Sequence, residues 1–174
     1  MRPFFLSFLL LILTGCANIP DSYAPPVQRK PLSPAEPRPF GHFVNMNDPN
    51  AEAYFIKDIA TVAEGPWRWT GKRPELKFFL ETVESLKFSL DYTIAEATFK
   101  STGPVTISVF LNGKLLEKLR HATHGEQHFE KPAPPPLLRR NEVNQVALEV
   151  DKVWVSPTDG AQLGFILTRA GFVQ

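Results

Sequence analysis

The stretch LKFSLDYTI, residues 86–94, alternates large apolar side chains with polar ones. Every second residue from Leu86 to Ile94 is apolar, whereas the residues between them are Lys, Ser, Asp and Thr. An alternation with a period of two is typical of a β-strand that buries one face and exposes the other. We therefore predict a half-buried strand over these residues.

A second stretch, VTISVFL at residues 105–111, repeats this alternation and runs directly into Asn112-Gly113. Asn-Gly is favoured in a type I′ turn because both central residues of that turn need positive φ angles. The pattern predicts a hairpin in which the KLLEKLR stretch from Lys114 returns antiparallel to residues 105–111.

Turn-forming residues separate several other short apolar runs, and outside the N-terminal leader no stretch keeps the three-four apolar spacing of a helix. The proline-rich residues 132–141 are expected as an edge loop or a single helical turn, because proline lacks the N–H that a strand ladder needs. We predict an all-β fold, an antiparallel β-sandwich of the jelly-roll kind with about eight strands. The remaining strands are expected at residues 53–59, 67–70, 76–81, 127–131, 144–150 and 163–169.

The N-terminus has the pattern of an export signal that ends at Cys16, the single cysteine of the chain. Arg2 is followed by an apolar run over residues 4–13, which is too short to cross ~30 Å of hydrocarbon. The LTGC sequence, residues 13–16, resembles the bacterial lipobox. That resemblance implies a diacylglycerol on the sulfur of Cys16 and an acylated amine, and Ala17 after it implies the outer membrane rather than the inner one. The alternative is an ordinary secretory signal that leaves Cys16 as an unmodified thiol.

These patterns divide the chain into a lipoprotein signal peptide (1–15), an acylated N-terminus with a Pro-rich linker (16–50) and a β-sandwich domain (51–174). Eight prolines lie between Pro20 and Pro49, and such a composition favours an extended polyproline II tether. We expect a protein of the cell envelope that is held on a membrane by its lipid.

Composition and motifs exclude several classes of function. Lys and Arg number 19 against 18 Asp and Glu, so no strong positive field attracts nucleic acid, which is not an expected partner. The chain has no G-x-S-x-G elbow, no H-E-x-x-H, no phosphate loop and no G-x-G-x-x-G. We therefore expect a binding protein rather than an enzyme, and no cofactor.

Two stretches contain tryptophans beside charged residues. In GPWRWTGKRPEL, residues 65–76, a strand would place Trp67 and Trp69 on one face and Arg68 on the other. The indoles either stack on a sugar ring or fill the core, in which case Arg68 pairs with an acid on a neighbouring strand. In EVDKVWVSPTDGAQLGF, residues 149–165, Trp154 and Asp159 either line a binding loop or belong to an ordinary turn.

A third stretch, HATHGEQH, gathers His121, His124 and His128 into eight residues. Zinc needs three or four ligands that converge in a tetrahedron, and this spacing on a turn matches no zinc signature. Glu126 and Glu130 share strand parity with His128, which a solvated outer face explains. We expect no metal site here.

The stretches WRWTGKRPEL, LDYTIAEATF, GPVTISVFLNGK, HFEKPAPP and EVDKVWVSPTDGAQLGFILTRAGF together resemble bacterial carbohydrate-binding-module-like jelly-roll domains, over about residues 53–174. The resemblance implies a galactose-binding-like β-sandwich with glycan contact near the tryptophans. We take Trp69 and Trp154 as stacking candidates, and Arg73 and Asp159 as polar candidates. The alternatives are a structural or assembly lipoprotein that binds a protein partner, and an unrecognised hydrolase.

Overall fold

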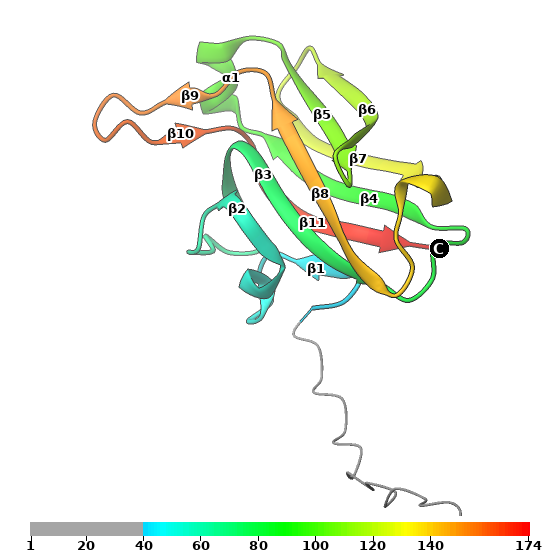
Figure 1. Ribbon diagram of the computed structural model, residues 1–174. Coiled ribbons are helices and arrows are strands. Elements are labelled where there is room, and N and C mark those ends of the chain that lie inside the picture. Colours follow the sequence, from blue (N-terminus) through cyan, green and yellow to red (C-terminus); the bar gives the residue numbers. More distant parts are fainter. Residues whose placement is uncertain (1–39) are drawn as a thin grey trace, which may run out of the picture. The chain divides into compact units, whose positions relative to one another are not determined.

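The computed structural model describes residues 40–174, which consist mainly of antiparallel strands (Figure 1). Cys16, the predicted signal and most of the predicted linker lie outside the described residues. Within residues 40–174, no helix combines the length and the apolar character that crossing a membrane would need.

The predicted all-β, jelly-roll sandwich is confirmed. Nine strands form one curled antiparallel sheet in the order β6-β5-β8-β3-β11-β4-β7, with β1 paired to β11 and β2 paired to β3. Two further strands, β9 and β10, form a separate hairpin. The strands are β1 (Phe43–Asn45), β2 (Phe55–Ile59), β3 (Arg68–Leu80), β4 (Lys87–Ile94), β5 (Val105–Leu111), β6 (Lys114–His121), β7 (Gly125–Pro132), β8 (Glu142–Val150), β9 (Trp154–Val155), β10 (Gln162–Leu163) and β11 (Ile166–Val173).

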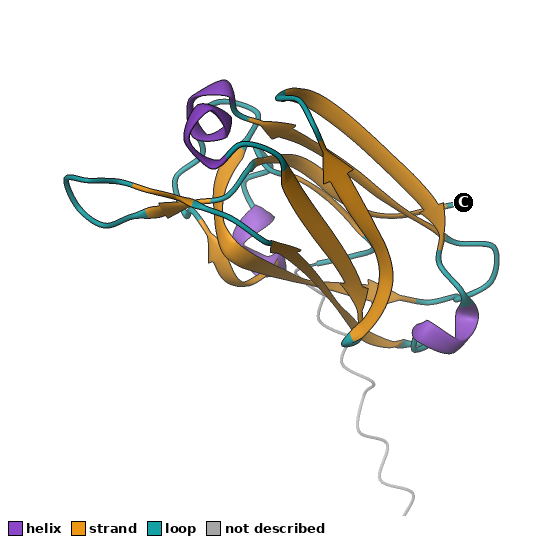
Figure 2. Cartoon of the chain, turned by 90° about the horizontal axis from the view of Figure 1, so that it is seen from above, coloured by secondary structure: helices purple, strands orange, loops and turns teal. Residues whose placement is uncertain are grey.

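The sheet is strongly curled (Figure 2), and its two layers meet at β3. We call β7, β4, β11 and β1 layer A, and β2, β3, β8, β5 and β6 layer B. The first residues of β3 pair with β11 and its later residues pair with β8, so β3 passes from one layer into the other. The largest side chains of the core between the layers are fully buried, namely Phe78, Phe88, Phe165 and Phe172. Burial of each such ring stabilises the fold by roughly 1.5–3 kcal/mol.

Sequence periodicity located the regular strands closely. The predicted strand at 105–111 coincides with β5, and the predicted strand at 86–94 differs from β4 by one residue. Asn112 and Gly113 have φ angles of 48° and 80°, so the predicted Asn-Gly hairpin is confirmed. The predicted helical turn in the proline-rich segment is present as η2 (Pro135–Leu137).

Other elements were not expected from the sequence. β1 precedes residue 51, where the sandwich was predicted to begin, and pairs with β11. A 3-10 helix, η1 (Ala51–Tyr54), takes the place of the first residues of the strand predicted at 53–59. A short helix, α1 (Glu96–Thr102), connects β4 to β5 and ends at Gly103, whose φ is 66°. The two strands predicted at 67–70 and 76–81 form the single strand β3.

The two ends of the sheet order, β6 and β7, face each other without pairing, and we call this line the seam. Side chains bridge it: the Lys131 ammonium of β7 forms an ion pair with Glu117 of β6 and lies 3.5 Å from the carbonyl oxygen of Leu116. Inside the sandwich, the hydroxyl of Tyr92 on β4 lies 2.9 Å from Nε2 of His121 on β6. Side-chain contacts therefore hold the seam where a backbone ladder is absent.

Candidate functional site

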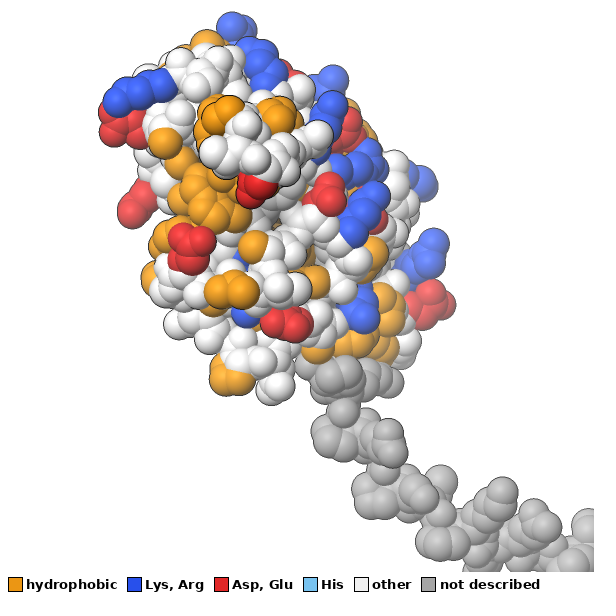
Figure 3. Space-filling model, turned by 90° about the vertical axis from the view of Figure 1, so that its left-hand side faces the viewer, with side chains coloured by type: hydrophobic (Ala, Val, Ile, Leu, Met, Phe, Trp, Pro, Cys, Tyr) orange, Lys and Arg blue, Asp and Glu red, His pale blue; other side chains and the backbone are white. Residues whose placement is uncertain are grey.

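An open groove of about 440 Å³ lies where β2, β3 and the β9–β10 hairpin meet, and we call it the β3 groove. Figure 3 shows the side of the molecule from which this hairpin projects; hydrophobic side chains there lie among acidic and basic ones. Nine residues line the groove: Asp58, Ile59, Ala60, Trp69, Thr70, Gly71, Lys72, Gln162 and Leu163.

A bulge between β2 and β3 shapes one part of the groove. Lys57 pairs with Glu75 and Ile59 pairs with Thr70, so the single residue Asp58 lies opposite four residues of β3. Asp58 has a φ of 57°, and its Oδ2 accepts a hydrogen bond of 3.0 Å from the backbone N–H of Arg73. A side-chain hydrogen bond thus replaces the missing ladder bond, and it fixes the Asp58 carboxylate at the groove.

The branch point of β3, where the two layers separate, shapes the opposite part. The hydroxyl of Thr70 donates to the carbonyl of Phe165 at 2.8 Å and accepts from the N–H of Phe165 at 3.1 Å. Gly164 approaches so closely that a Cβ built on it would lie 2.4 Å from the carbonyl oxygen of Gly71. Only glycine allows this approach, and it brings Gln162 and Leu163 of the hairpin to the groove.

The alternation of β3 places the tryptophans outside and the arginine inside. Trp67 and Trp69 are half-buried and meet edge to face, with ring centroids 6.1 Å apart, whereas Arg68 is buried. The interpretation that the indoles fill the core is therefore wrong. The expected partner of Arg68 was an acid on a neighbouring strand, but the guanidinium instead donates to backbone carbonyls, and its nearest carboxylate is Glu52 at 3.8 Å.

Three polar side chains of the β3 groove have no side-chain partner elsewhere in the described region. Among residues 40–174, Oδ1 of Asp58, the ammonium of Lys72 and the amide of Gln162 make no hydrogen bond or ion pair. The indole N–H of Trp69 is likewise unpaired within this range. The groove thus combines an aromatic ring with donors and acceptors that water or a ligand has to satisfy.

Of the four predicted ligand-binding residues, only Trp69 lines the β3 groove. Trp154 lies on β9, directly opposite Leu163 of the groove wall. Asp159 is at the tip of the same hairpin, where hydrogen bonds from Ser156 and from the N–H of Ala161 lower the pKa of its carboxyl group. Asp159 therefore has a role in the turn that accounts for its presence.

Arg73 follows the groove along β3 but points its side chain onto the outer face of layer B. Its guanidinium lies 3.1 Å from Glu75, forms an ion pair with Glu149 and stacks 5.2 Å from the ring centre of Phe110. Burial opposes the ionisation of Glu75, but its contacts with Lys57 and Arg73 outweigh burial and lower the pKa of the carboxyl group. Arg73 is therefore engaged by protein groups.

The three histidines diverge. His121 contacts Tyr92 inside the sandwich, His124 packs against the ring of Phe99, and Nδ1 of His128 is hydrogen-bonded to Asp91. Within residues 40–174 no group of three or more metal-ligating side chains converges. Glu126, His128 and Glu130 are all exposed, as a solvated outer face of β7 predicts.

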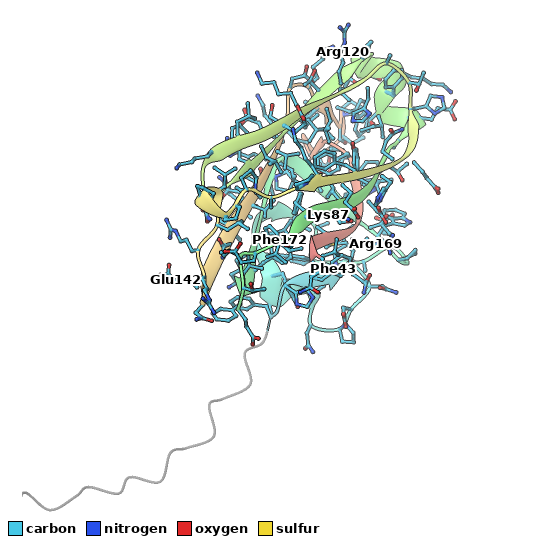
Figure 4. The ribbon with its side chains drawn as sticks, turned by 90° about the vertical axis from the view of Figure 1, so that its right-hand side faces the viewer. Phe43, Lys87, Arg120, Glu142, Arg169 and Phe172 are labelled. Atoms are coloured by element: carbon cyan, nitrogen blue, oxygen red, sulfur yellow. The ribbon has the colours of Figure 1, made fainter. Side chains whose placement is uncertain are left out.

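A second groove of about 430 Å³ lies on the outer face of layer A, and we call it the β4 groove. At its centre Asp91 accepts hydrogen bonds from His128 of β7 and Arg169 of β11. Burial opposes the ionisation of Asp91, but these two contacts outweigh it and lower the pKa of the carboxyl group. Figure 4 shows the opposite side from Figure 3, with Lys87 and Arg169 of layer A labelled. The lining residues are Asp91, Tyr92, Thr93, Glu126, Gln127, His128, Thr168 and Arg169.

No protein-family profile and no curated protein matches the sequence. A family 35 carbohydrate binding module from Clostridium thermocellum is similar in structure, with 12% identity and a TM-score of 0.43 over 71% of this chain and 94% of that chain.

A second family 35 module, from an environmental isolate, has 7% identity and a TM-score of 0.45 over 76% of this chain and 92% of that chain. An exo-beta-1,3-galactanase from Phanerochaete chrysosporium has 7% identity and a TM-score of 0.43 over 77% of this chain and 29% of that chain. These TM-scores are low, so the function of the β3 groove has to be inferred from its own residues.

The other polar groups of the β3 groove were not predicted from the sequence. Asp58 and Gln162 lie in strands far apart in the sequence, and Lys72 lies three residues after Trp69. The available signal was the KDI stretch at residues 57–59, in which an Asp interrupts an otherwise regular strand. Aspartate tolerates a positive φ better than most residues, so it is a reasonable marker of a bulge.

Proposed function

We propose that this chain is a non-catalytic glycan-binding module and that the β3 groove is its binding site. One observation carries the proposal: the half-buried indole of Trp69 lines the same open groove as Oδ1 of Asp58, the ammonium of Lys72 and the amide of Gln162, which are unpaired within residues 40–174. An indole offers an apolar surface to the C–H face of a pyranose ring, and the surrounding donors and acceptors suit its hydroxyl groups.

The chemistry of the groove favours binding over hydrolysis. Most glycosidases need two carboxyl groups that face each other at about 5 to 9.5 Å. Asp58 is the single carboxylate among the residues that line the β3 groove. One carboxylate, one ammonium and one amide can bind the hydroxyl groups of a neutral or weakly charged sugar chain. They do not supply the carboxyl pair that its hydrolysis would need.

In the cell, we propose that an acylated Cys16 holds the chain on a membrane of the envelope, with the outer membrane favoured by Ala17. The proline-rich stretch between Pro20 and Pro49 would then act as the tether between lipid and module. Metabolic labelling with a palmitate analogue tests this part: the wild-type chain should be labelled and the Cys16→Ser variant should not. An unlabelled wild-type chain would disprove the anchor without affecting the groove.

The binding site is tested with the full chain carrying Cys16→Ser, so that it can be purified without detergent. Affinity electrophoresis through a panel of neutral and acidic polysaccharides should reveal retardation by at least one of them. In the Trp69→Ala variant the affinity for that polysaccharide should fall at least tenfold, roughly 1.4 kcal/mol or more. Trp154→Ala should cause a smaller loss, because Trp154 lies beside Leu163 rather than in the groove lining.

Arg169→Ala is the matched control, because Arg169 belongs to the β4 groove. It should leave the affinity within about twofold of the starting chain. Equal affinity of the Trp69→Ala variant and the starting chain, with both folded, would reject the β3 groove as the binding site. Retardation by no polysaccharide would reject glycan binding for the panel tested.

A further inference from the structure

Arg68 is an unusual residue for the interior of this fold, because a buried cation is costly unless other groups compensate its charge. The residue is only 6% exposed, and its nearest carboxylate, Glu52, lies 3.8 Å away with 60% of its own side chain exposed. An exposed carboxylate at that distance contributes little. The guanidinium must therefore be compensated mainly by other groups.

Backbone carbonyls and an aromatic ring supply that compensation. Nε of Arg68 donates to the carbonyl of Met46 at 2.8 Å, and Nη1 donates to the carbonyls of Ala60 and Thr61, the first of them at 3.1 Å. The guanidinium carbon also lies 5.2 Å from the ring centre of Phe55. The planar fork of an arginine can reach several carbonyls at once, whereas the ammonium of a lysine cannot do so with the same geometry.

These contacts connect three segments that are separate in the sequence. Met46 follows β1, Ala60 and Thr61 follow β2, and Arg68 itself begins β3. The connection between β2 and β3 also makes backbone hydrogen bonds: the N–H of Ala60 donates to the carbonyl of Trp69 at 2.9 Å, and the N–H of Glu64 donates to the carbonyl of Trp67 at 3.1 Å.

The same connection forms a wall of the β3 groove. Ile59 and Ala60 line the groove together with Trp69, which follows Arg68 in the chain and points to the opposite face. The indole of Trp69 thus lies on one face of β3. From the opposite face the guanidinium of Arg68, the residue before it, is hydrogen-bonded to the segment that forms this wall.

We propose that Arg68 is a positioning residue of the β3 groove: its guanidinium holds the carbonyls of Ala60 and Thr61 against β3 and so fixes the spacing between the groove wall and the indole of Trp69. Arg68 is buried on the other face of β3, so its side chain does not line the β3 groove. The significance for binding rests on the proposed function of the groove, whereas the geometric role does not.

Hydrogen exchange measured by NMR on the full chain with Cys16→Ser tests the geometric role without any glycan. In the Arg68→Met variant, the amides of Ala60 and Glu64 should exchange about tenfold faster or more, whereas those of Leu90 and Ile107 in the core strands should keep their protection. Arg68→Lys should restore part of the protection of Ala60, because a lysine retains the charge and one donor group. Arg169→Met, which removes a surface arginine from layer A, should leave Ala60 and Glu64 unchanged.

Unchanged exchange at Ala60 and Glu64 in a folded Arg68→Met variant would overturn the proposal. So would a loss of protection spread equally over Leu90 and Ile107, because that result would assign Arg68 to general stability. If the methionine variant does not fold, the lysine variant decides by the same amides. A failure of the starting chain to bind any polysaccharide would count against the proposed function alone, since the exchange measurement uses no ligand.

Discussion

The β3 groove and the β4 groove have almost the same volume, about 440 and 430 Å³, but they differ in how their charged groups are satisfied. In the β4 groove the central carboxylate, Asp91, is bound on both sides by His128 and Arg169. In the β3 groove Oδ1 of Asp58, the ammonium of Lys72 and the amide of Gln162 have no partner among residues 40–174.

The aromatic residues differ in the same direction. Trp69 lines the β3 groove with a half-buried indole, whereas Tyr92 of the β4 groove is buried and packs against Phe165. Burial raises the pKa of the Tyr92 hydroxyl. Hollows of nearly equal volume can therefore differ in how far their polar groups are satisfied by the protein itself. Groups that already have protein partners gain less from a ligand than groups that depend on water.

The largest effect on this comparison is expected from Gly164→Ala, which should break the β3 groove at the branch point. The new Cβ would lie 2.4 Å from the carbonyl oxygen of Gly71, so the hairpin or β3 has to move. We expect a loss of about 2–3 kcal/mol in the free energy of unfolding, measured by urea denaturation.

Gly160→Ala is the matched control, since Gly160 lies in the same hairpin with a φ of 72° and no atom within 4 Å of its Cβ position. Backbone strain alone should cost about 1 kcal/mol there. Equal losses for the two variants would show that close packing at Gly164 has no special importance.

A smaller effect is expected from Asp58→Asn, which sharpens the comparison by changing charge at nearly constant shape. Asparagine also tolerates the positive φ of this position and keeps an oxygen for the N–H of Arg73. Glycan affinity should fall about five- to tenfold, roughly 1–1.4 kcal/mol, because a charge-assisted hydrogen bond is lost. Stability should change by less than about 0.5 kcal/mol; a large loss of stability would instead assign Asp58 a purely structural role.

Asp91→Asn should have the opposite profile, with a modest effect on stability and none on glycan binding. We expect a loss of about 0.5–1 kcal/mol at pH 7, because the contacts with His128 and Arg169 are partly exposed. Since the folded-state pKa of Asp91 is lowered, its stabilisation is present above the ordinary value of 3.8 and is lost as the pH falls below it.

The Asp91→Asn variant should therefore approach the starting chain in stability at about pH 3, in thermal unfolding recorded from pH 7 to 3. A constant difference over that range would show that the charge of Asp91 is not the cause. Reduced glycan affinity in this variant would contradict the contrast between the two grooves.

The smallest effect is expected from His121→Gln, which lies outside both grooves. Burial lowers the pKa of His121 in the folded chain, so the neutral form is favoured there. The free energy of unfolding therefore falls as the pH drops below the ordinary His121 pKa of 6.5, because the unfolded chain takes up the proton more readily than the folded one. Above that value His121 is neutral in both states and adds no pH dependence. Between pH 7.5 and about 5.5, the melting temperature of the variant should fall less than that of the starting chain; parallel curves would contradict this role.

How far the sequence predicts the structure depends on whether the pattern is local. The alternation in residues 86–94 and the Asn112-Gly113 pair act over a few residues, and both predictions were confirmed. The helix α1 has only seven residues and no repeated apolar spacing, so periodicity could not reveal it. β1 has three residues, and its pairing with β11 comes from the far end of the chain.

The candidate site was predictable only in part, for the same reason. Alternation correctly separated Arg68 from Trp67 and Trp69, but it could not tell which face of the strand is buried. An arginine inside a sandwich becomes acceptable only through the carbonyls of Met46 and Ala60, which no local pattern in WRWT reveals. Two separate strands were predicted at residues 67–70 and 76–81, whereas the hydrogen bond from the N–H of Arg73 to Asp58 carries β3 through the bulge as one strand.

The seam gives this sandwich a preferred line of weakness. β6 and β7 are consecutive in the chain, yet they lie at the two ends of the strand order, and the ion pair of Lys131 with Glu117 is one of the bridges between them. Separating these two strands sacrifices side-chain bonds but no rung of backbone pairing. Transient breathing of the sandwich should therefore start there, on the far side of the sheet order from the hairpin and its groove, so that the fold can flex without disturbing the β3 groove.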